Sequence, residues 1–220
     1  MEMIKAEYIS KRYDDVQVLK DITFSINESE ISVFKGRSGC GKSTLLNICS
    51  FLENKESGIL NLFGTSVDTV DEKKKRDLLR NDIGYVFQDY NLFEDFSLYD
   101  NLKMYFLATG KWSSKESDEL IKEKLSLVGL FEKADKKVKL LSGGERQRAA
   151  MARVLLTPKR IVFADEPSAN IDDDNVEIMK SIFVDMKKKG TALMIVSHED
   201  VFDDIADRIY VLSGGVLHEQ

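Results

Sequence analysis

Several stretches of the chain alternate apolar and polar residues or are apolar throughout, as β-strands are. Residues 2–10 place Ile4, Ala6 and Tyr8 two positions apart, and this period indicates a half-buried strand. Residues 18–26 follow the same rule. Further strands are expected where apolar residues run together, at residues 31–34, 58–64, 83–87, 160–164, 192–196 and 208–212.

Helical spacing replaces the strand pattern over residues 89–157. Within it, residues 98–109 are rich in aromatic and apolar side chains, and Ser113 and Glu116 have the spacing of a helix-capping box. Strands that alternate with helices favour an α/β fold with a parallel sheet and right-handed crossovers. Because helical spacing interrupts the strand pattern over residues 89–157, we predict a helical lobe inserted between strands of that sheet. Other helices are expected after residue 44 and over residues 71–80 and 175–189.

The chain has 220 residues and a net charge of −6, a length that fits one domain. This charge argues against a nucleic-acid partner held by bulk electrostatics. No apolar run approaches the roughly 20 residues of a membrane span. The first residues lack the basic and apolar segments of a signal peptide. A cytosolic location is therefore expected.

A phosphate-binding motif lies at residues 36–43, which fit Gly-x-x-x-x-Gly-Lys-[Ser/Thr] with Gly36 and Gly41 as the outer glycines. The motif stands between a predicted strand and a predicted helix, where glycines let the backbone direct successive N–H groups inward. The helix adds its positive end. Lys42 would supply a cation for the β- and γ-phosphates, and Ser43 a hydroxyl for Mg²⁺. A glycine turn with a chance lysine is the alternative, which the flanking elements disfavour.

Cys40 and Cys49 are the two cysteines. Nine helical residues would separate them by ~13 Å, whereas a disulfide tolerates ~7 Å, so no bridge is expected. Cys49 is predicted to be a core residue. Cys40 is interpreted first as a tolerated small residue. The alternative hypothesis is that alkylating Cys40, in the phosphate loop, blocks nucleotide binding by its bulk.

Two carboxylates, Asp165 and Glu166, follow the apolar run at residues 161–164. Ligands of open parallel sheets bind at the carboxyl ends of strands. Asp165 can hold Mg²⁺ through water, and Glu166 can accept a proton from an attacking water. An acidic loop after a strand is the common alternative, but the phosphate loop favours the functional interpretation.

The most specific string in the chain is Leu-Ser-Gly-Gly-Glu-Arg-Gln-Arg at residues 141–148. Ser142 can cap a helix that begins near Gly144. Its hydroxyl and the glycine N–H groups can form a second anion site. A capped helix without a ligand is the alternative. A single nucleotide would already have its phosphates in the loop at residues 36–43, so it does not explain why a second helix end should bind phosphate.

With these motifs in this order, the chain resembles the ATP-binding-cassette (ABC) ATPases over nearly its whole length. Gln88 matches that family's Q-loop, Asp172 its D-loop and His198 its switch histidine. The residues alone place Tyr13 in a polar turn, equally as a surface anchor or as a base-stacking platform. The resemblance favours the second, because Tyr13 matches the aromatic residue that stacks on adenine.

The resemblance implies an α/β P-loop NTPase with a RecA-like parallel core sheet, an N-terminal antiparallel β subdomain and an inserted α-helical subdomain. Residues 1–220 would form a single domain. The core and the β subdomain would comprise residues 1–88 and 158–220, and the helical subdomain residues 89–157.

The resemblance also implies that the chain binds ATP and Mg²⁺. Lys42, Gln88, Glu166 and His198 would be catalytic, with Glu166 as the general base and His198 at the γ-phosphate. Ser43 and Gln88 would ligate Mg²⁺, and Asp165 would hold it from the outer shell. The nucleotide-binding positions would be Tyr13, Gly36, Ser38, Gly39, Cys40, Gly41, Lys42, Ser43 and Thr44, with Ser142, Gly143, Gly144 and Asp172.

Two partners are implied by the resemblance. In this family Ser142 and Gly144 reach the ATP of the opposite subunit, so a head-to-tail dimer of two ATPase subunits around two ATP molecules is expected. An integral membrane permease on a separate chain would bind the dimer at the inner face of the cell membrane. Residues 89–99 lie where relatives receive a permease helix, and either they dock that helix or they pack the helical lobe. Relatives often have proline where this chain has Glu94.

The compact chain and its loop at residues 168–172 resemble the macrolide-export, lipoprotein-release and bacteriocin-export ATPases. Export of an antimicrobial peptide, a bacteriocin, a drug or a lipoprotein is therefore expected. One alternative is an ABC ATPase that acts with a membrane partner in cell division. The other is a soluble DNA-repair-type cassette, which the lack of sustained heptads between residues 41 and 142 disfavours.

Overall fold

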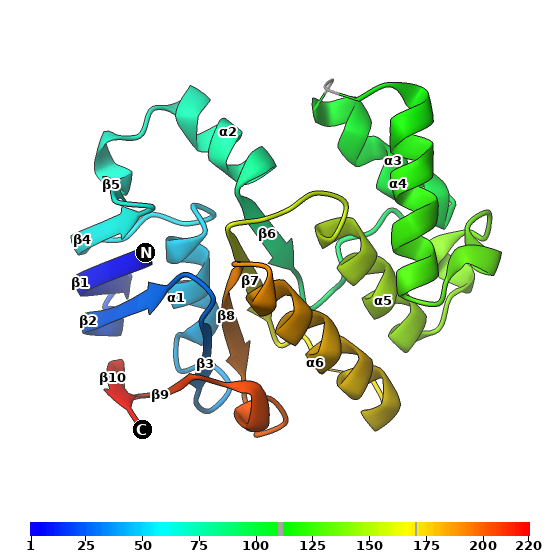
Figure 1. The fold of residues 1–220 in the computed structure, drawn as a ribbon. Coiled ribbons are helices and arrows are strands. Elements are labelled where there is room, and N and C mark those ends of the chain that lie inside the picture. The colour runs from blue at the N-terminus through cyan, green and yellow to red at the C-terminus, as the bar shows by residue number, and fades with distance from the viewer. Residues whose placement is uncertain (110–111, 170) are drawn as a thin grey trace.

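The computed structural model describes residues 1–109, 112–169 and 171–220. Its N-terminal part is a four-stranded antiparallel sheet in the order β2-β1-β4-β5, which lies at the left in Figure 1. The strands are β1 (Glu2–Tyr13), β2 (Val16–Asn27), β4 (Ser57–Leu62) and β5 (Thr65–Ser66).

Tyr13 is the last residue of β1 and pairs with Val16 of β2. The prediction that Tyr13 lies in a polar turn was therefore wrong. The turn consists of Asp14 and Asp15, and Asp14 adopts the left-handed conformation with φ 49°. Aspartate tolerates this conformation better than bulky residues do, which fits a two-residue hairpin loop.

The second sheet has six strands in the order β10-β9-β3-β8-β7-β6. All neighbours pair in parallel except β10, which is antiparallel to β9. The carboxyl ends meet at one edge, where Lys35 pairs with Ser197 and Asp165 with Val196. The predicted parallel core sheet is thus confirmed. The strands are β3 (Ile31–Lys35), β6 (Ile83–Val86), β7 (Ile161–Asp165), β8 (Ala192–Ser197), β9 (Arg208–Ser213) and β10 (Val216–Glu219).

The helices lie on both sides of this sheet, with α1 between the two sheets and α3 and α4 at the right of Figure 1. The predicted capping box of Ser113 and Glu116 is confirmed at the start of α4. Among the helices that the structure describes, none is long and apolar enough to cross a lipid bilayer. The elements are α1 (Lys42–Cys49), α2 (Glu72–Asn81), α3 (Leu98–Thr109), α4 (Ser114–Leu127), α5 (Gly143–Val154) and α6 (Asp173–Lys188), with short 3₁₀ turns η1 (Val67–Thr69), η2 (Phe131–Lys133), η3 (Val138–Leu140) and η4 (Asp203–Ile205).

The parallel strands contribute side chains to two hydrophobic cores. On β8, Met194 and Val196 are buried in a cluster with α1 and the antiparallel sheet. Leu193 and Ile195 are buried on the other face in a cluster with α3 to α6. A strand covered on both faces is apolar at every position, which explains the unbroken apolar run that predicted β8.

Candidate functional site

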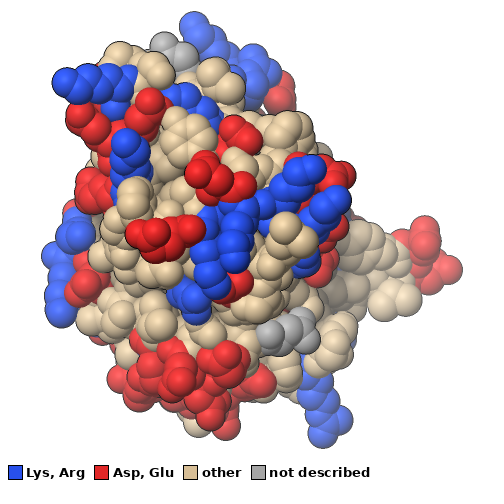
Figure 2. All heavy atoms as spheres, turned by 90° about the vertical axis from the view of Figure 1, so that its right-hand side faces the viewer, with Lys and Arg blue, Asp and Glu red and all other residues tan. Residues whose placement is uncertain are grey.

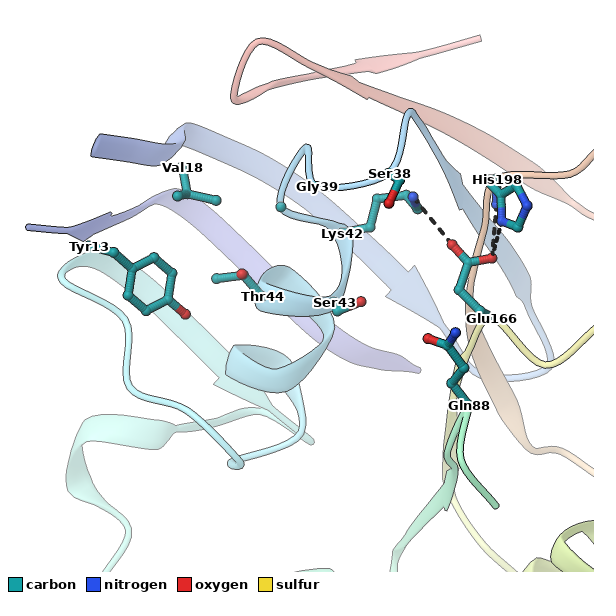
Figure 3. A pocket seen from close by; sticks show the side chains of 11 residues that line it. Tyr13, Val18, Ser38, Gly39, Lys42, Ser43, Thr44, Gln88, Glu166 and His198 are labelled. Atoms are coloured by element: carbon teal, nitrogen blue, oxygen red, sulfur yellow. Dashed lines mark hydrogen bonds and ion pairs between the residues drawn. The ribbon is translucent and has the colours of Figure 1, made fainter. Parts of the chain in front are cut away.

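A cavity of about 490 Å³ lies at the carboxyl edge of the parallel sheet. Three strands deliver residues to it directly, because Gln88, Glu166 and His198 follow β6, β7 and β8 respectively. The loop between β3 and α1 forms the opposite wall (Figure 3). The lining residues are Tyr13, Val18, Ser38, Gly39, Gly41, Lys42, Ser43, Thr44, Gln88, Glu166 and His198.

The loop before α1 folds around its own lysine. Nζ of Lys42 donates hydrogen bonds to the carbonyl oxygens of Gly36 (2.9 Å) and Arg37 (3.3 Å), and the side chain is only 5% exposed. Gly36 cannot carry a side chain here, since a Cβ would lie 2.4 Å from the carbonyl oxygen of Leu212. The loop therefore presents its N–H groups and the ammonium group to a phosphate with little freedom to rearrange.

Glu166 lies between Lys42 and His198 (Figure 3). One carboxylate oxygen is 3.3 Å from Nζ of Lys42. The other accepts a hydrogen bond from the backbone N–H of His198 (3.1 Å) and lies 2.7 Å from its Nδ1. Glu166 has a positive φ of 44°, which is a strained conformation for this residue type and typical of functional sites. The backbone therefore holds this carboxylate in one fixed place.

Ser43 lines the cavity and Asp165 lies behind it, so two side-chain oxygen groups come together there. Oγ of Ser43 donates a hydrogen bond of 2.9 Å to Asp165. Burial raises the pKa of Asp165, and the bond from Ser43 opposes that shift. Among the described residues, no three His, Cys, Asp or Glu side chains could hold a metal ion by themselves. The set of Ser43, Asp165 and the Gln88 amide nevertheless fits Mg²⁺, which usually takes one or two carboxylates together with substrate phosphates.

Tyr13 lines the other end of the cavity with Val18 and Thr44. Its hydroxyl donates a hydrogen bond to Glu53, which also pairs with Lys11 at 2.8 Å. Nζ of Lys11 lies 5.1 Å from the centre of the Tyr13 ring. Burial and the bond to Glu53 raise the pKa of Tyr13. These contacts fix the orientation of a ring that is 44% exposed.

The helix tip at residues 142–144 lies elsewhere. Ser142 is the N-cap of α5, as predicted: its Oγ accepts a hydrogen bond from the N–H of Glu145 (3.3 Å). The Glu145 carboxylate accepts one from the N–H of Ser142 (2.9 Å). None of Ser142, Gly143, Gly144 and Asp172 is among the described residues that line the cavity.

Three further predicted positions lie beside the cavity without lining it. Gly36 and Cys40 belong to the loop, and Asp165 is the last residue of β7. The Cys40 thiol points toward Gly36, where an added Cβ would lie 2.7 Å from Sγ. Val18 and Glu53 are residues that the sequence analysis missed. Neither could be identified as a site residue from the sequence, because Val18 is one of several apolar residues in an alternating strand and Glu53 is one of many acidic residues.

Comparisons with known proteins identify the family. The family model described as ABC transporter matches residues 19–169. A lipoprotein-releasing system ATP-binding protein of Bacteroides thetaiotaomicron is 37% identical over 98% of this chain and 99% of its own length. A macrolide export ATP-binding/permease protein of Chlorobaculum tepidum is 31% identical over 98% of this chain but only 33% of its own length.

Solved structures agree with the sequence comparisons. The dimeric ABC transporter cassette MJ0796 superposes with a TM-score of 0.92 at 28% identity, covering 99% of this chain and 98% of the cassette. A second structure of that cassette, a dimer in a post-hydrolysis state with ADP and Pi, matches equally well. Together with the phosphate loop and the acidic strand end, these matches show that the chain belongs to the ABC transporter family, as an ATP-binding subunit that hydrolyses ATP.

Proposed function

We propose that this chain drives export through a separate membrane permease by closing and opening a dimer around two ATP molecules. One observation carries the proposal. The phosphate loop, Glu166 and His198 share a single cavity, whereas the Ser142 helix tip lies outside it. A helix end that suits an anion and lies outside this cavity fits the nucleotide of another subunit.

Within the cavity, each residue has a role that its contacts support. Lys42 binds the β- and γ-phosphates with the N–H groups of the loop. Glu166, oriented by His198, accepts the proton of the attacking water, while His198 contacts the γ-phosphate. Ser43 and Gln88 would ligate Mg²⁺, with Asp165 behind Ser43. The ion would neutralise charge on the phosphate oxygens.

Tyr13 is the platform for the adenine ring. Its hydroxyl and one side of its ring are held by Glu53 and Lys11, so the ring is oriented before a base stacks on it. Val18 and Thr44 line the same end of the cavity. Stacking on an aromatic ring is typically worth about 1–3 kcal/mol per base.

Two copies of the chain would pair head to tail. Each would place Ser142, Gly143 and Gly144 at the γ-phosphate held by the other, with Asp172 beside them. Two solved structures of the similar cassette MJ0796 are dimeric, and a symmetric pair buries the same surface on both subunits. The N–H groups at the start of α5 suit a phosphate. Hydrolysis would remove the bridging γ-phosphate and let the dimer open.

Residues 1–88 and 158–220 would bind nucleotide, and the helical subdomain of residues 89–157 would contact the permease. Phe93 and Phe96 are 59% and 46% exposed and pack edge to face, whereas Leu92 and Tyr99 pack against the core. We therefore assign permease docking to the two phenylalanines and a packing role to the other two. Glu94, at a position where the family often has proline, pairs with Arg146 of α5 at 3.2 Å.

The charge on the face that carries the helical subdomain supports a protein partner there rather than a nucleic acid. Figure 2 views the side that carries the helical subdomain. Lys and Arg gather near its middle and at its top, and acidic residues lie between them and gather at the lower left, so the two signs of charge are interspersed on this face. Nucleic-acid interfaces need a basic stripe. With a permease as its partner, the chain would be cytoplasmic and peripheral on the inner face of the cell membrane.

The export assignment rests on relatives that are named for lipoprotein release and macrolide export. The experiment is affinity purification of the tagged chain from detergent-solubilised membranes, followed by mass spectrometry of what co-purifies. We expect one integral membrane protein in stoichiometric amount, whose loss releases the chain from the membrane fraction. A chain found entirely in the soluble fraction, with no membrane partner, would contradict the proposal.

A further inference from the structure

Asn175, in the first turn of α6, touches both elements that the proposed split site needs from one subunit. These elements are the start of α5, at residues 142–144, and the loop that ends at Asp172. They come from different parts of the chain, and none of the motifs found in the sequence includes Asn175. Its contacts nevertheless reach from one element to the other.

The first set of contacts holds Asp172. One carboxylate oxygen of Asp172 accepts hydrogen bonds from the backbone N–H of Asn175 (2.9 Å) and from its side-chain Nδ2 (2.7 Å). Asp172 is the N-cap of α6. The two bonds lower the pKa of Asp172, so it stays ionised and attached to Asn175. Asp172 is therefore held by both the backbone and the side chain of Asn175.

The second set of contacts reaches α5. Oδ1 of Asn175 accepts a hydrogen bond from Nη1 of Arg148. Asn175 also covers the backbone of Gly144 so closely that an added Cβ would lie 2.5 Å from its Nδ2 and 2.9 Å from its Cγ. Gly144 is not in a left-handed conformation, so a side chain there would be opposed by this packing and would force Asn175 to move.

We infer that Asn175 is a positioning residue that couples the α5 tip to the Asp172 loop, so that both reach the neighbouring ATP together. This inference rests on the proposed function. The amide group is what the coupling requires, because its NH₂ donates to Asp172 while its oxygen accepts from Arg148. Aspartate in its place would keep the bond from Arg148 and set a like charge against Asp172. Alanine would lose both bonds.

The test uses the hydrolysis-deficient Glu166→Gln protein, in which an ATP-dependent dimer accumulates. Asn175→Ala and Asn175→Asp are added separately, and dimer formation with ATP is measured by analytical ultracentrifugation. We expect both to weaken dimerisation, and both to lower kcat in the otherwise native chain, by roughly ten- to hundredfold. The ATP-induced thermal shift of the monomer should stay unchanged, because Asn175 lies outside the cavity. Asp174→Ala, which alters an exposed neighbour in the same turn, should leave all three measurements unchanged.

A second measurement does not depend on activity. Alanine normally stabilises a helix relative to glycine, but Gly144→Ala should lower Tm here because the new Cβ meets Asn175. In the Asn175→Ala background that clash is gone, and Gly144→Ala should raise Tm. A drop in Tm of the same size in both backgrounds would overturn the packing argument.

The outcomes separate this inference from the proposed function. If Glu166→Gln forms no dimer with ATP, the split site itself is contradicted. If it dimerises and the Asn175 variants dimerise equally well, only the coupling role is overturned. Loss of the ATP-induced thermal shift in Asn175→Ala would also overturn it, because Asn175 would then support the fold rather than position the two elements.

Discussion

Nζ of Lys42 lies 3.3 Å from a carboxylate oxygen of Glu166, and both side chains are largely buried, at 5% and 12% exposed. The residue proposed to bind phosphate and the residue proposed to accept a proton are thus direct neighbours, although they lie far apart in the chain. Removing one partner of a buried ion pair strongly destabilises the folded protein, because the other charge is left buried without a partner. Variants of either residue must therefore be tested for folding before their kinetics are interpreted.

Glu166→Gln should keep ATP binding and nearly abolish turnover, because glutamine retains the shape of glutamate but cannot accept the proton. A general base contributes roughly 10²–10⁴ in rate. The same variant should accumulate a dimer with ATP, measured by size-exclusion chromatography. Turnover within a few-fold of the parent would show that another group is the base.

Lys42→Ala should lose the thermal stabilisation that ATP gives. Mass action sets that stabilisation near 2.7 kcal/mol at a hundredfold excess of ligand over Kd, and differential scanning fluorimetry measures it. Lys20→Ala, which removes the same side chain at an exposed position of β2, is the matched control and should keep the full shift. An undiminished shift in Lys42→Ala would rule out the loop as the phosphate site.

Tyr13→Ala should raise KM for ATP while leaving kcat nearly unchanged, because stacking binds substrate and transition state equally. The lost stacking is worth about 1–3 kcal/mol. Tyr13→Phe keeps the ring and should stay close to the parent. Tyr8→Ala removes an exposed tyrosine from the same strand and should change nothing. If Tyr8→Ala and Tyr13→Ala raised KM equally, Tyr13 would not be the adenine platform.

Alkylation of the folded protein should modify Cys40 and spare Cys49. Cys49 is fully buried and its pKa is strongly raised by that burial, whereas Cys40 is partly exposed. An adduct on Cys40 would press on Gly36 and distort the loop, so ATP affinity should fall. The Cys40→Ser protein should be insensitive to the reagent. Full modification with unchanged ATP affinity would support the simpler view of Cys40 as a tolerated small residue.

Lys159 should make stability rise with pH between about 8 and 10.5. Its ammonium is buried beside the carbonyl of Arg80 and the hydroxyl of Tyr105, and burial lowers its pKa from 10.5 to about 8. In that window the unfolded chain binds more protons than the folded one, so raising the pH favours folding, by up to roughly 3 kcal/mol.

Denaturant unfolding of the parent and of Lys159→Met at several pH values checks this difference. The parent should gain stability relative to the variant as the pH rises above 8. If the free energies of unfolding of the two proteins changed with pH in parallel, Lys159 would have the same pKa in the folded and unfolded states.

The motifs were readable in the sequence because each is local. The phosphate loop, the capped helix at Ser142 and the acid pair after β7 each need only a few consecutive residues of fixed type, so their flanking patterns predicted their structure. The parallel sheet followed from strand and helix alternation in the same way. The boundaries between strands and turns were predicted less well. The polar neighbours of Tyr13 indicated a turn, but Tyr13 pairs with β2 and is a strand residue.

The supporting residues could not be predicted, because their importance comes from partners distant in the chain. Glu53 matters through Tyr13 and Lys11, and Asn175 through Arg148 and Gly144. Glutamate and asparagine are common residue types, and neither position belongs to a periodic pattern of the sequence. The Lys42 and Glu166 contact likewise exists only once the sheet is assembled.

The strand order has a consequence for how the chain becomes functional during synthesis. β3 leads directly into the phosphate loop, yet it pairs only with β8 and β9, and the backbone of Gly36 rests against the carbonyl oxygen of Leu212 in β9. The two edges of β3 therefore stay open on the ribosome until β8 and β9 emerge. Such late, long-range pairing is slow and leaves strand edges exposed to aggregation. Nascent chains of this protein should thus acquire nucleotide binding only after β9 has emerged, and should depend on chaperones until then.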